Sequence, residues 1–268
     1  MNAIIQPHNQ KPASVWSSGG AAYEEISRQI ATALAHCVVR LDPQPGERIL
    51  DVATGTGWTS RLVAERGAIV TGVDIAAELL AAARAKAPRT FALDYQIGDA
   101  EALPFPDGTF DGVASTFGVM FASRQEAAAA ELARVTRKGG RIALATWKPD
   151  STVFQMFQVM RGYMPPPPTP APASPFAWGG RERVTELLGR DFDLSFEEGD
   201  AVCYARDGDA VWQVFVNGYG PTKMLADSLD PAKREALHRD FAAFHDTFSS
   251  PLGIAMPRQY LITVGTRR

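Results

Sequence analysis

The chain has 268 residues, of which 46% are hydrophobic and 21% are charged, and this suits one large globular domain or a domain with a cap. A net charge of −3 argues against a general nucleic-acid binder, and no apolar run is long enough for a membrane span. The two cysteines form no disulfide framework, so we expect reduced thiols in a cytoplasmic protein.

The first residues are polar and contain two prolines, and we expect a flexible tail over residues 1–15. Apolar side chains then recur at helical spacing between Tyr23 and Arg40, which predicts an amphipathic helix. A turn-rich linker follows and ends near Gly46. We therefore expect residues 16–45 to form a helical cover on the core.

A strand, a glycine loop and a helix follow one another directly after the linker. The apolar run 49–52 predicts a strand that is buried on both faces of a parallel sheet. It is followed by Thr-Gly-Thr-Gly at 54–57, where the glycines allow a sharp turn and a close approach of a ligand to the main chain. Residues 58–66 have a helical pattern, and Gly67 is suited to end that helix. This is the first half of a nucleotide-binding βαβ unit.

The second strand, 68–73, ends at Asp74, which lies about 20 residues after Gly55. An acidic residue at that distance accepts hydrogen bonds from the hydroxyls of a ribose in such units. The alternative is that Asp74 only caps the helix expected over residues 75–86.

Residues of the loop indicate which nucleotide it binds. A dinucleotide fingerprint has glycine or alanine three positions after its second glycine, and here that position is Ser60. Asp51 lies four residues before Gly55, where a carboxylate would repel a pyrophosphate but could receive an ammonium group, directly or through water. S-adenosylmethionine carries an amino group, a ribose and an adenine without phosphate. The loop therefore favours S-adenosylmethionine over a dinucleotide.

The third strand, 91–97, ends in Gly98-Asp99-Ala100. The carboxylate of Asp99 can accept from the exocyclic amine of adenine, and Ala100 can offer its backbone N–H to a ring nitrogen. The alternative is a turn aspartate that binds its own backbone. The fourth strand is expected over 111–115, and residues 116–122 open onto the cleft at its carboxyl end, where ligands of open α/β sheets bind.

With these motifs the chain resembles the class I S-adenosylmethionine-dependent methyltransferases. The resemblance is strong between Gly46 and Trp147 and rests on four motifs in order: 51–57, 72–74, 98–100 and 137–141. The loop 103–110 is similar to that of the ubiquinone/menaquinone-biosynthesis-like subgroup, methyltransferase type 11. The resemblance implies a Rossmann-like, doubly wound α/β sheet that is mostly parallel, with an antiparallel last strand and a helical cap. The cofactor-binding residues that we expect are Asp51, Ala53, Thr54, Gly55, Gly57, Asp74, Ile75, Leu79, Gly98, Asp99, Ala100, Ser115, Phe117 and Gly118.

Beyond residue 147 the composition shifts. A run rich in proline begins at Pro165 and predicts an extended spacer, with a ligand for a proline-binding module as the alternative. Strand character returns in 192–204 and 259–266. We expect residues 46–206 and 251–268 to form the methyltransferase domain. The aromatic-rich helical segment 207–250 is then an inserted cap that shapes the acceptor site.

Methyl transfer requires few catalytic side chains, because alignment of donor and acceptor supplies much of the acceleration. Resemblance makes Trp16 and Tyr23 candidates for the wall of the site; plain packing is the alternative. If the acceptor is a hydroxyl, the candidates for a base are Tyr219, His238 and His245, with the alternative that the histidines are exposed helix residues without a catalytic role. The candidate catalytic residues are Tyr23, Tyr219 and His245. The histidines lack metal-ligand spacing, so no metal is expected.

These patterns together predict a methyltransferase with S-adenosylmethionine as cofactor and S-adenosylhomocysteine as product. The expected acceptor is a small apolar or aromatic molecule, methylated on nitrogen or oxygen, and the expected state is a monomer or homodimer. Within the class, a quinone-ring C-methyltransferase or a peptide methyltransferase is the alternative. A non-catalytic scaffold or regulator that binds S-adenosylmethionine is the alternative from another class, and an NAD-dependent oxidoreductase is more distant.

Overall fold

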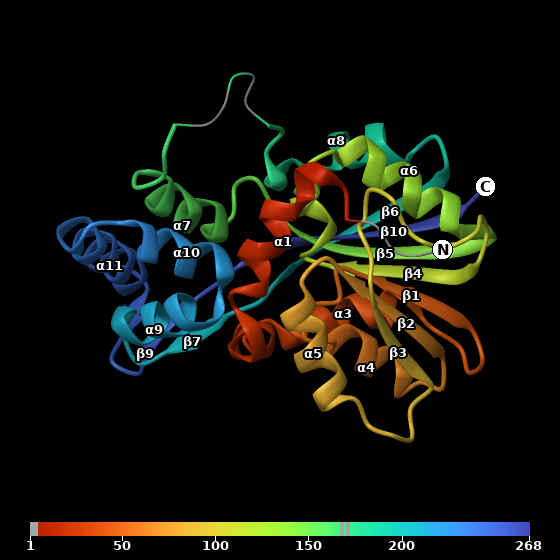
Figure 1. Ribbon diagram of the computed structural model, residues 1–268, viewed down its shortest axis with the longest axis horizontal. Helices are drawn as coiled ribbons and strands as arrows, with labels where there is room; N and C mark the ends of the chain where they lie inside the picture. Colours follow the sequence, from red (N-terminus) through yellow and green to blue (C-terminus); the bar gives the residue numbers. More distant parts are fainter. Residues whose placement is uncertain (1–4, 167–168, 170–171) are drawn as a thin grey trace.

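The computed structural model describes residues 5–166, 169 and 172–268 (Figure 1). Seven strands form one sheet in the order β3-β2-β1-β4-β5-β10-β6. Neighbours from β3 to β5 are parallel, whereas β10 is antiparallel to both β5 and β6. The prediction of a Rossmann-like, mostly parallel sheet with an antiparallel last strand is confirmed. The strands are β1 (Arg48–Val52), β2 (Ile69–Asp74), β3 (Leu93–Ile97), β4 (Phe110–Thr116), β5 (Thr136–Trp147), β6 (Phe192–Asp200) and β10 (Gln259–Arg267).

Helices cover both faces of this sheet (Figure 1). The central strand β1 is buried from Ile49 to Val52, as its continuous apolar run predicts. Gly57 adopts φ +81°, and a Cβ on it would lie 2.1 Å from the Tyr95 hydroxyl, so only glycine fits at this turn. One face carries α3 (Ala31–Leu41), α4 (Trp58–Ala64) and α5 (Ala77–Lys86), and the other carries α6 (Gln125–Val135) and α8 (Arg181–Leu188).

The N-terminal segment is helical from Pro7, where the sequence predicted a flexible tail. The 3-10 helix η1 (Pro7–Asn9) leads into helix α1 (Gln10–Ser17). Pro12 lies in the first turn of α1, where backbone N–H groups have no partner within the helix, so it does not break the helix. The helix expected from Tyr23 is divided into α2 (Tyr23–Arg28) and α3, and the 3-10 helix η2 (Gly20–Ala22) precedes it.

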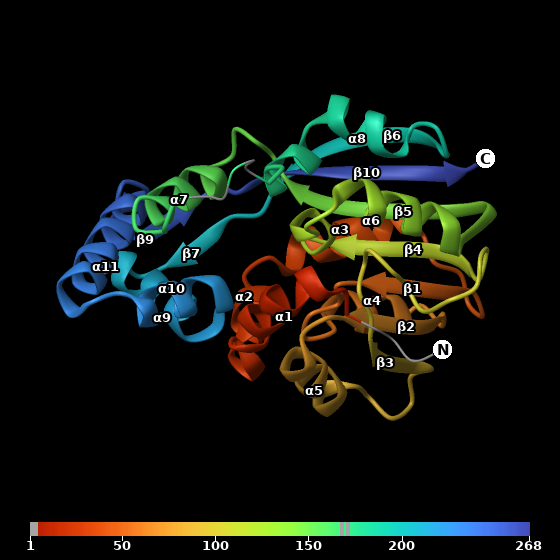
Figure 2. The same cartoon turned by 45° about the horizontal axis from the view of Figure 1, so that its top comes forward.

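A second lobe lies on the side to which the parallel strands point (Figure 2). It contains the helices that were expected in the cap segment 207–250. The last of them, α11 (Pro231–Asp246), packs on α9 (Gly208–Gly218) and also on α7 (Thr152–Arg161), which lies outside the expected cap segment. A small sheet in the order β7-β9-β8 was also missed, and it takes up part of the segment expected to continue β6. The lobe comprises α7 (Thr152–Arg161), α9 (Gly208–Gly218), α10 (Gly220–Ser228), α11 (Pro231–Asp246), β7 (Cys203–Ala205), β8 (Ser249–Ser250) and β9 (Gly253–Met256).

The proline-rich run falls partly on residues 167–168 and 170–171, which lie outside the described residues. Of the remainder, Pro175 begins the short 3-10 helix η4 (Pro175–Gly179), where a fixed φ suits the first helical position. The prediction of an extended spacer is therefore wrong at Pro175, and it stays a prediction for the run before that residue.

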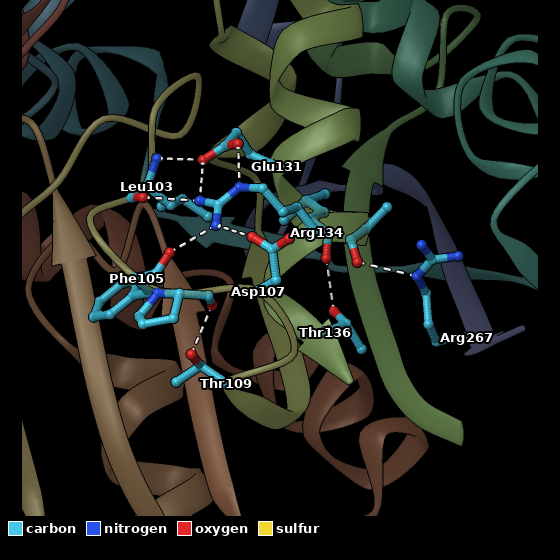
Figure 3. A network of polar contacts seen from close by, with 11 residues as sticks. Leu103, Phe105, Asp107, Thr109, Glu131, Arg134, Thr136 and Arg267 are labelled. Carbon is cyan, nitrogen blue, oxygen red and sulfur yellow. Dashed lines mark hydrogen bonds and ion pairs between the residues drawn. The ribbon is translucent and has the colours of Figure 1, made fainter. Parts of the chain in front are cut away.

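The loop between β3 and β4 is held by one arginine of α6 (Figure 3). Arg134 donates to the carbonyl oxygens of Leu103 and Phe105 at 2.9 and 2.7 Å. It also pairs with Glu131 and Asp107, at 2.7 and 2.9 Å. Glu131 in turn accepts from the backbone N–H of Leu103 at 2.6 Å. Arg134 therefore fixes the segment that connects the edge strand β3 to β4.

Replacement Arg134→Met keeps most of the aliphatic length but removes every hydrogen bond of the guanidinium. We expect the free energy of unfolding to fall by about 1–3 kcal/mol, because carbonyl and carboxylate partners remain without their donor. Urea unfolding measures this. Arg206→Met is the control, since that side chain is 81% exposed and should change stability by less than about 0.5 kcal/mol. Equal stability of the two variants would contradict the assigned role of Arg134.

Candidate active site

A cavity lies at the carboxyl ends of the central strands, beneath the N-terminal helices. Its empty space is about 900 Å³, including the part that is open to solvent. The cavity takes residues from the ends of β1 to β4 and from the N-terminal segment. Of the expected cofactor residues it contains Ala53, Thr54, Gly55, Asp74, Ile75, Leu79, Gly98, Asp99, Ala100, Phe117 and Gly118, together with Trp16 and Tyr23.

Other lining residues were not among the expected site residues. Ser27, Ile30 and Leu34 belong to the N-terminal helices, whose inward face could have been read from their helical spacing. Asn9 and Pro12 were missed because the tail was expected to be flexible. Trp58 and Thr59 were also missed, whereas Thr116, Phe121 and Ala122 belong to the segment 116–122 that was expected to open onto the cleft.

The ends of β1 and β4 meet at backbone distance on the cavity floor. Ala53 and Phe117 both have a φ of +56°, a backbone conformation that residues other than glycine rarely adopt. A Cβ on Gly118 would lie 2.3 Å from the Cβ of Ala53, so this crossing needs a glycine. Strained backbone of this kind is concentrated at functional sites.

Asp74 is 6% exposed and lines the cavity. Its two oxygens accept from the backbone N–H groups of Gly55 and Ala76, both at 2.8 Å. Burial raises the pKa of Asp74 to about 6. Asp74 thus binds the backbone just before α5, but the N-cap residue of that helix is Ala76 and not, as the capping alternative required, Asp74. It also fixes the glycine loop, and each oxygen keeps acceptor capacity for a ligand.

Three expected cofactor residues do not line the cavity. Asp51 is fully buried behind Thr54, and one of its oxygens accepts from the hydroxyls of Thr54 and Ser60 at 2.6 and 2.7 Å. Burial raises the pKa of Asp51 to about 6. Asp51 therefore orients the glycine loop. Because Thr54 lies between Asp51 and the cavity, Asp51 can attract the ammonium group of a ligand only at a distance, without direct contact. Gly57 is turned toward Tyr95.

Ser115 ties the strand ends together instead of facing the cavity. Its hydroxyl donates to the carbonyl of Val52 at 2.7 Å and accepts from the N–H of Val119 at 3.0 Å. These bonds join β1 to the 3-10 helix η3 (Val119–Phe121). The expected contact of Ser115 with the methionine part is thus replaced by a structural role that places Phe117 and Gly118.

Asp99 is 2% exposed and is surrounded by donors. It accepts from the N–H of Glu101 at 3.0 Å, which is the turn that the alternative interpretation expects. It also accepts from the N–H of Gln6 at 2.9 Å and from Nδ2 of Asn9 at 3.1 and 3.0 Å. The N-terminal segment is therefore bound to the carboxylate that was expected to contact adenine.

Aromatic rings form the other half of the cavity. Trp16 packs edge-on against Phe121 and Tyr23, with ring centroids 5.1 and 6.2 Å away. Tyr219 contacts Trp16 from outside the lining, at 5.4 Å, so it supports the wall without forming it. Burial, together with the nearby carboxylate of Asp74, raises the pKa of Tyr23, and burial raises the pKa of Tyr219. Both hydroxyls therefore keep their protons at neutral pH.

His245 was expected as a base, and the structure corrects this. Its side chain is fully buried in the lobe, against the rings of Phe241, Phe215 and Phe244, and is absent from the cavity lining. Its Nδ1 lies 2.8 Å from the carbonyl oxygen of Phe241. Burial lowers the pKa of His245 to about 4, which suits a neutral core residue.

The other three histidines are paired outside the aromatic half of the cavity. Among the described residues, no three His, Cys, Asp or Glu side chains are placed to hold a metal ion. Within the same residues, no helix is long and apolar enough to cross a membrane. The pairs are His8 with Glu101, His36 with Tyr260 and Glu197, and His238 with Asp209.

The lowered pKa of His245 leads to a stability prediction. Between pH 6.5 and 4 the unfolded chain binds a proton here that the folded chain does not, so the contribution to stability is complete above pH 6.5 and is lost toward pH 4. Between pH 7 and 4, we expect the wild type to lose up to about 3 kcal/mol more stability than His245→Phe. Urea unfolding across this range measures the difference. Identical acid dependence would show that His245 is not buried in the neutral form.

Comparisons with known proteins agree with the fold and the strand-end motifs. A methyltransferase-domain family model matches residues 50–144. An uncharacterized protein of Mycobacterium tuberculosis is 37% identical over 233 residues, which are 82% of this chain and 83% of that protein. The demethylmenaquinone methyltransferase of Renibacterium salmoninarum is 38% identical over 115 residues, covering 41% of this chain and 47% of the enzyme. The crystal structure of the YcgJ protein of Bacillus subtilis has a TM-score of 0.63 and 19% identity, covering 88% of this chain and 98% of that one.

Proposed function

This chain belongs to the class I S-adenosylmethionine-dependent methyltransferases, and we propose that it methylates a small apolar or aromatic molecule on nitrogen or oxygen. The observation that carries the proposal is the division of one cavity into two halves. One half is built from the strand ends and their loops, and the other from aromatic rings of the N-terminal segment and of η3.

The first half fits the cofactor. Asp74 lies in the cavity lining beside Thr54 and Gly55, where its carboxylate can accept hydrogen bonds from a ribose diol. Asp99 and Ala100 stand at the end of β3, where an adenine would lie. A bound S-adenosylmethionine supplies a sulfonium methyl group as the electrophile. The absence of a phosphate suits a site whose only charged lining residues, within the described chain, are two aspartates.

The second half fits an uncharged, flat acceptor. Trp16, Tyr23 and Phe121 line it. A charged acceptor would lose hydration here without gaining a partner, whereas an aromatic ring can pack edge-on or offset against these side chains. This supports an apolar or aromatic acceptor over a charged metabolite.

Residues of this chain would mainly align the acceptor. The Tyr23 ring lies on the glycine loop, with its Cε1 3.6 Å from the position of a Cβ on Gly55, so it borders both halves. Because its hydroxyl stays protonated, Tyr23 can donate a hydrogen bond to the acceptor but is not suited as a base. Alignment of the kind that this wall provides is a main source of acceleration in a displacement reaction.

Methylation of a quinone ring on carbon is a second candidate, favoured by the similarity to a demethylmenaquinone methyltransferase. That similarity covers 41% of this chain, and the family model matches residues 50–144. The aromatic half is formed largely by residues outside that range, so the acceptor has to be found by experiment. Peptide methylation and a non-catalytic scaffold are the remaining alternatives.

Asp74→Ala tests the cofactor half. We expect the affinity for S-adenosylhomocysteine to fall at least tenfold, because a ribose loses a charged acceptor whose hydrogen bonds are worth about 1.5–3 kcal/mol each. Titration calorimetry measures the affinity, and circular dichroism checks the fold. Glu78→Ala is the matched control, since Glu78 is exposed on the helix that follows. Binding of NAD by the wild type without binding of S-adenosylhomocysteine would refute the assignment of the cofactor.

A methyl-acceptor screen tests the reaction. The protein is incubated with isotope-labelled S-adenosylmethionine and with panels of phenols, aryl amines, naphthoquinols, short peptides and charged small metabolites. We expect label in a phenol or an aryl amine. Label on a quinol carbon would select the second candidate, and label in a peptide the third. Tight binding of S-adenosylhomocysteine without transfer to any panel would favour the scaffold.

A further inference from the structure

Helix α1 connects the two halves of the cavity. Asn9 precedes its first residue and lines the cavity beside Asp99, whereas Trp16 lies in its last turn and lines the aromatic half. A helix is rigid over this length, so the position of Asn9 and the position of Trp16 are linked. Any contact that fixes one end of α1 also sets the other.

The Asn9 end is fastened to the core. Its side-chain amide donates to both oxygens of Asp99, at 3.1 and 3.0 Å, and its own oxygen accepts from the Ser123 hydroxyl at 2.7 Å. Asn9 is 4% exposed, so these bonds are shielded from water. Nε2 of His8 also lies within hydrogen-bond distance of a carboxylate oxygen of Glu101, at 2.6 Å. The segment before α1 is thus held by side chains of the loop after β3 and by Ser123.

The Trp16 end is set between the core and the second lobe. Its indole touches Phe121 of η3, Tyr23 of α2 and Tyr219 of the lobe, with centroids 5.1 to 6.2 Å apart. Three elements that are distant in the sequence therefore meet on one side chain. A shift of α1 would change the shape of the aromatic half directly.

Glycines bring the N-terminal segment and the lobe into backbone contact. A Cβ on Gly220 would lie 2.2 Å from the carbonyl oxygen of Val15, and a Cβ on Gly19 would lie 2.3 Å from that of Gly218. Such contact leaves no room for side chains between α1 and the lobe. The Asn9–Asp99 pair consequently also ties the lobe, through α1, to the core.

We propose that Asn9 is a positioning residue which, by binding Asp99, holds α1 closed and so places Trp16 as the wall against which a flat acceptor ring packs. The proposal rests on the proposed function for the identity of the acceptor half, but the closure of α1 itself does not depend on methyl transfer. Asp99 is already surrounded by donors from Gln6, Asn9 and Glu101. A ligand amine that binds Asp99 must therefore share the acceptor oxygens of this carboxylate with the N-terminal segment. Ligand binding in the first half of the cavity is thereby coupled to the position of α1, and so to ligand binding in the aromatic half.

The test compares Asn9→Ala and Asn9→Asp with Gln10→Ala. Asn9→Asp is nearly isosteric, but it removes the amide donor and places a second carboxylate against Asp99, so it separates hydrogen bonding from packing. Gln10 is exposed at the start of the same helix and serves as the control. Amide hydrogen exchange of residues 13–17 reports the closure of α1. Trp16 emission, isolated by subtracting matched Trp16→Phe spectra, reports the wall.

In both Asn9 variants we expect exchange in α1 to be at least tenfold faster and Trp16 emission to shift to the red, with Gln10→Ala unchanged. In an Asp99→Ala background, Asn9→Ala should add only a small part of its effect, because the bonds to Asp99 are absent and only the bond from Ser123 remains to be lost. Unchanged exchange and emission in both Asn9 variants that remain folded would overturn the proposal, as would a full additional effect in the Asp99→Ala background.

Kinetics with an acceptor found in the screen give the second readout. We expect the acceptor KM of Asn9→Ala to rise at least fivefold, and an unchanged KM would overturn the positioning role. If no acceptor is methylated but α1 still opens in the Asn9 variants, the proposed function fails while the closure of α1 stands. If methylation proceeds and α1 is unaffected, only the present proposal fails.

Discussion

Two buried carboxylates hold the glycine loop, and the rest of the site is arranged around that loop. Asp51 accepts from the hydroxyls of Thr54 and Ser60, and Asp74 accepts from the N–H of Gly55. A buried carboxylate is costly unless hydrogen bonds satisfy it, so the loop must follow a path that delivers these donors. That path leaves the main chain of the loop facing the cavity. The same burial raises the pKa of both aspartates.

The floor of the cavity follows from the same constraint. Once β1 turns at Ala53, the turn after β4 has to pass at backbone distance, which Gly118 permits and which leaves Phe117 at positive φ. Phe117 then stacks on Trp147 at the end of β5, with ring centroids 3.9 Å apart. The turn at Ala53 therefore influences the position of Trp147, the last residue of β5, after which the chain enters the second lobe.

The two halves of the cavity are built by different means. The half that we propose for the cofactor consists of residues at the ends of consecutive strands, so parallel pairing alone brings them together. The aromatic half needs α1, η3 and the lobe to pack on one another, and Trp16 lies where they meet. Variation in the lobe can therefore change the shape of the aromatic half while leaving the strand-end half in place.

The sequence by itself determined the parallel sheet, the glycine loop and most of the cavity-lining residues between Ala53 and Gly118, because strand periodicity, turn glycines and their spacing are local signals. It could not determine that Asn9 binds Asp99, 90 residues away, so the first helix was taken for a flexible tail. It also could not show that α11 turns His245 into a core of phenylalanines instead of into the cavity. Those outcomes depend on which distant surfaces pack together. Only the tertiary structure decided them, because a side chain's partners across the fold are not encoded in the residues beside it.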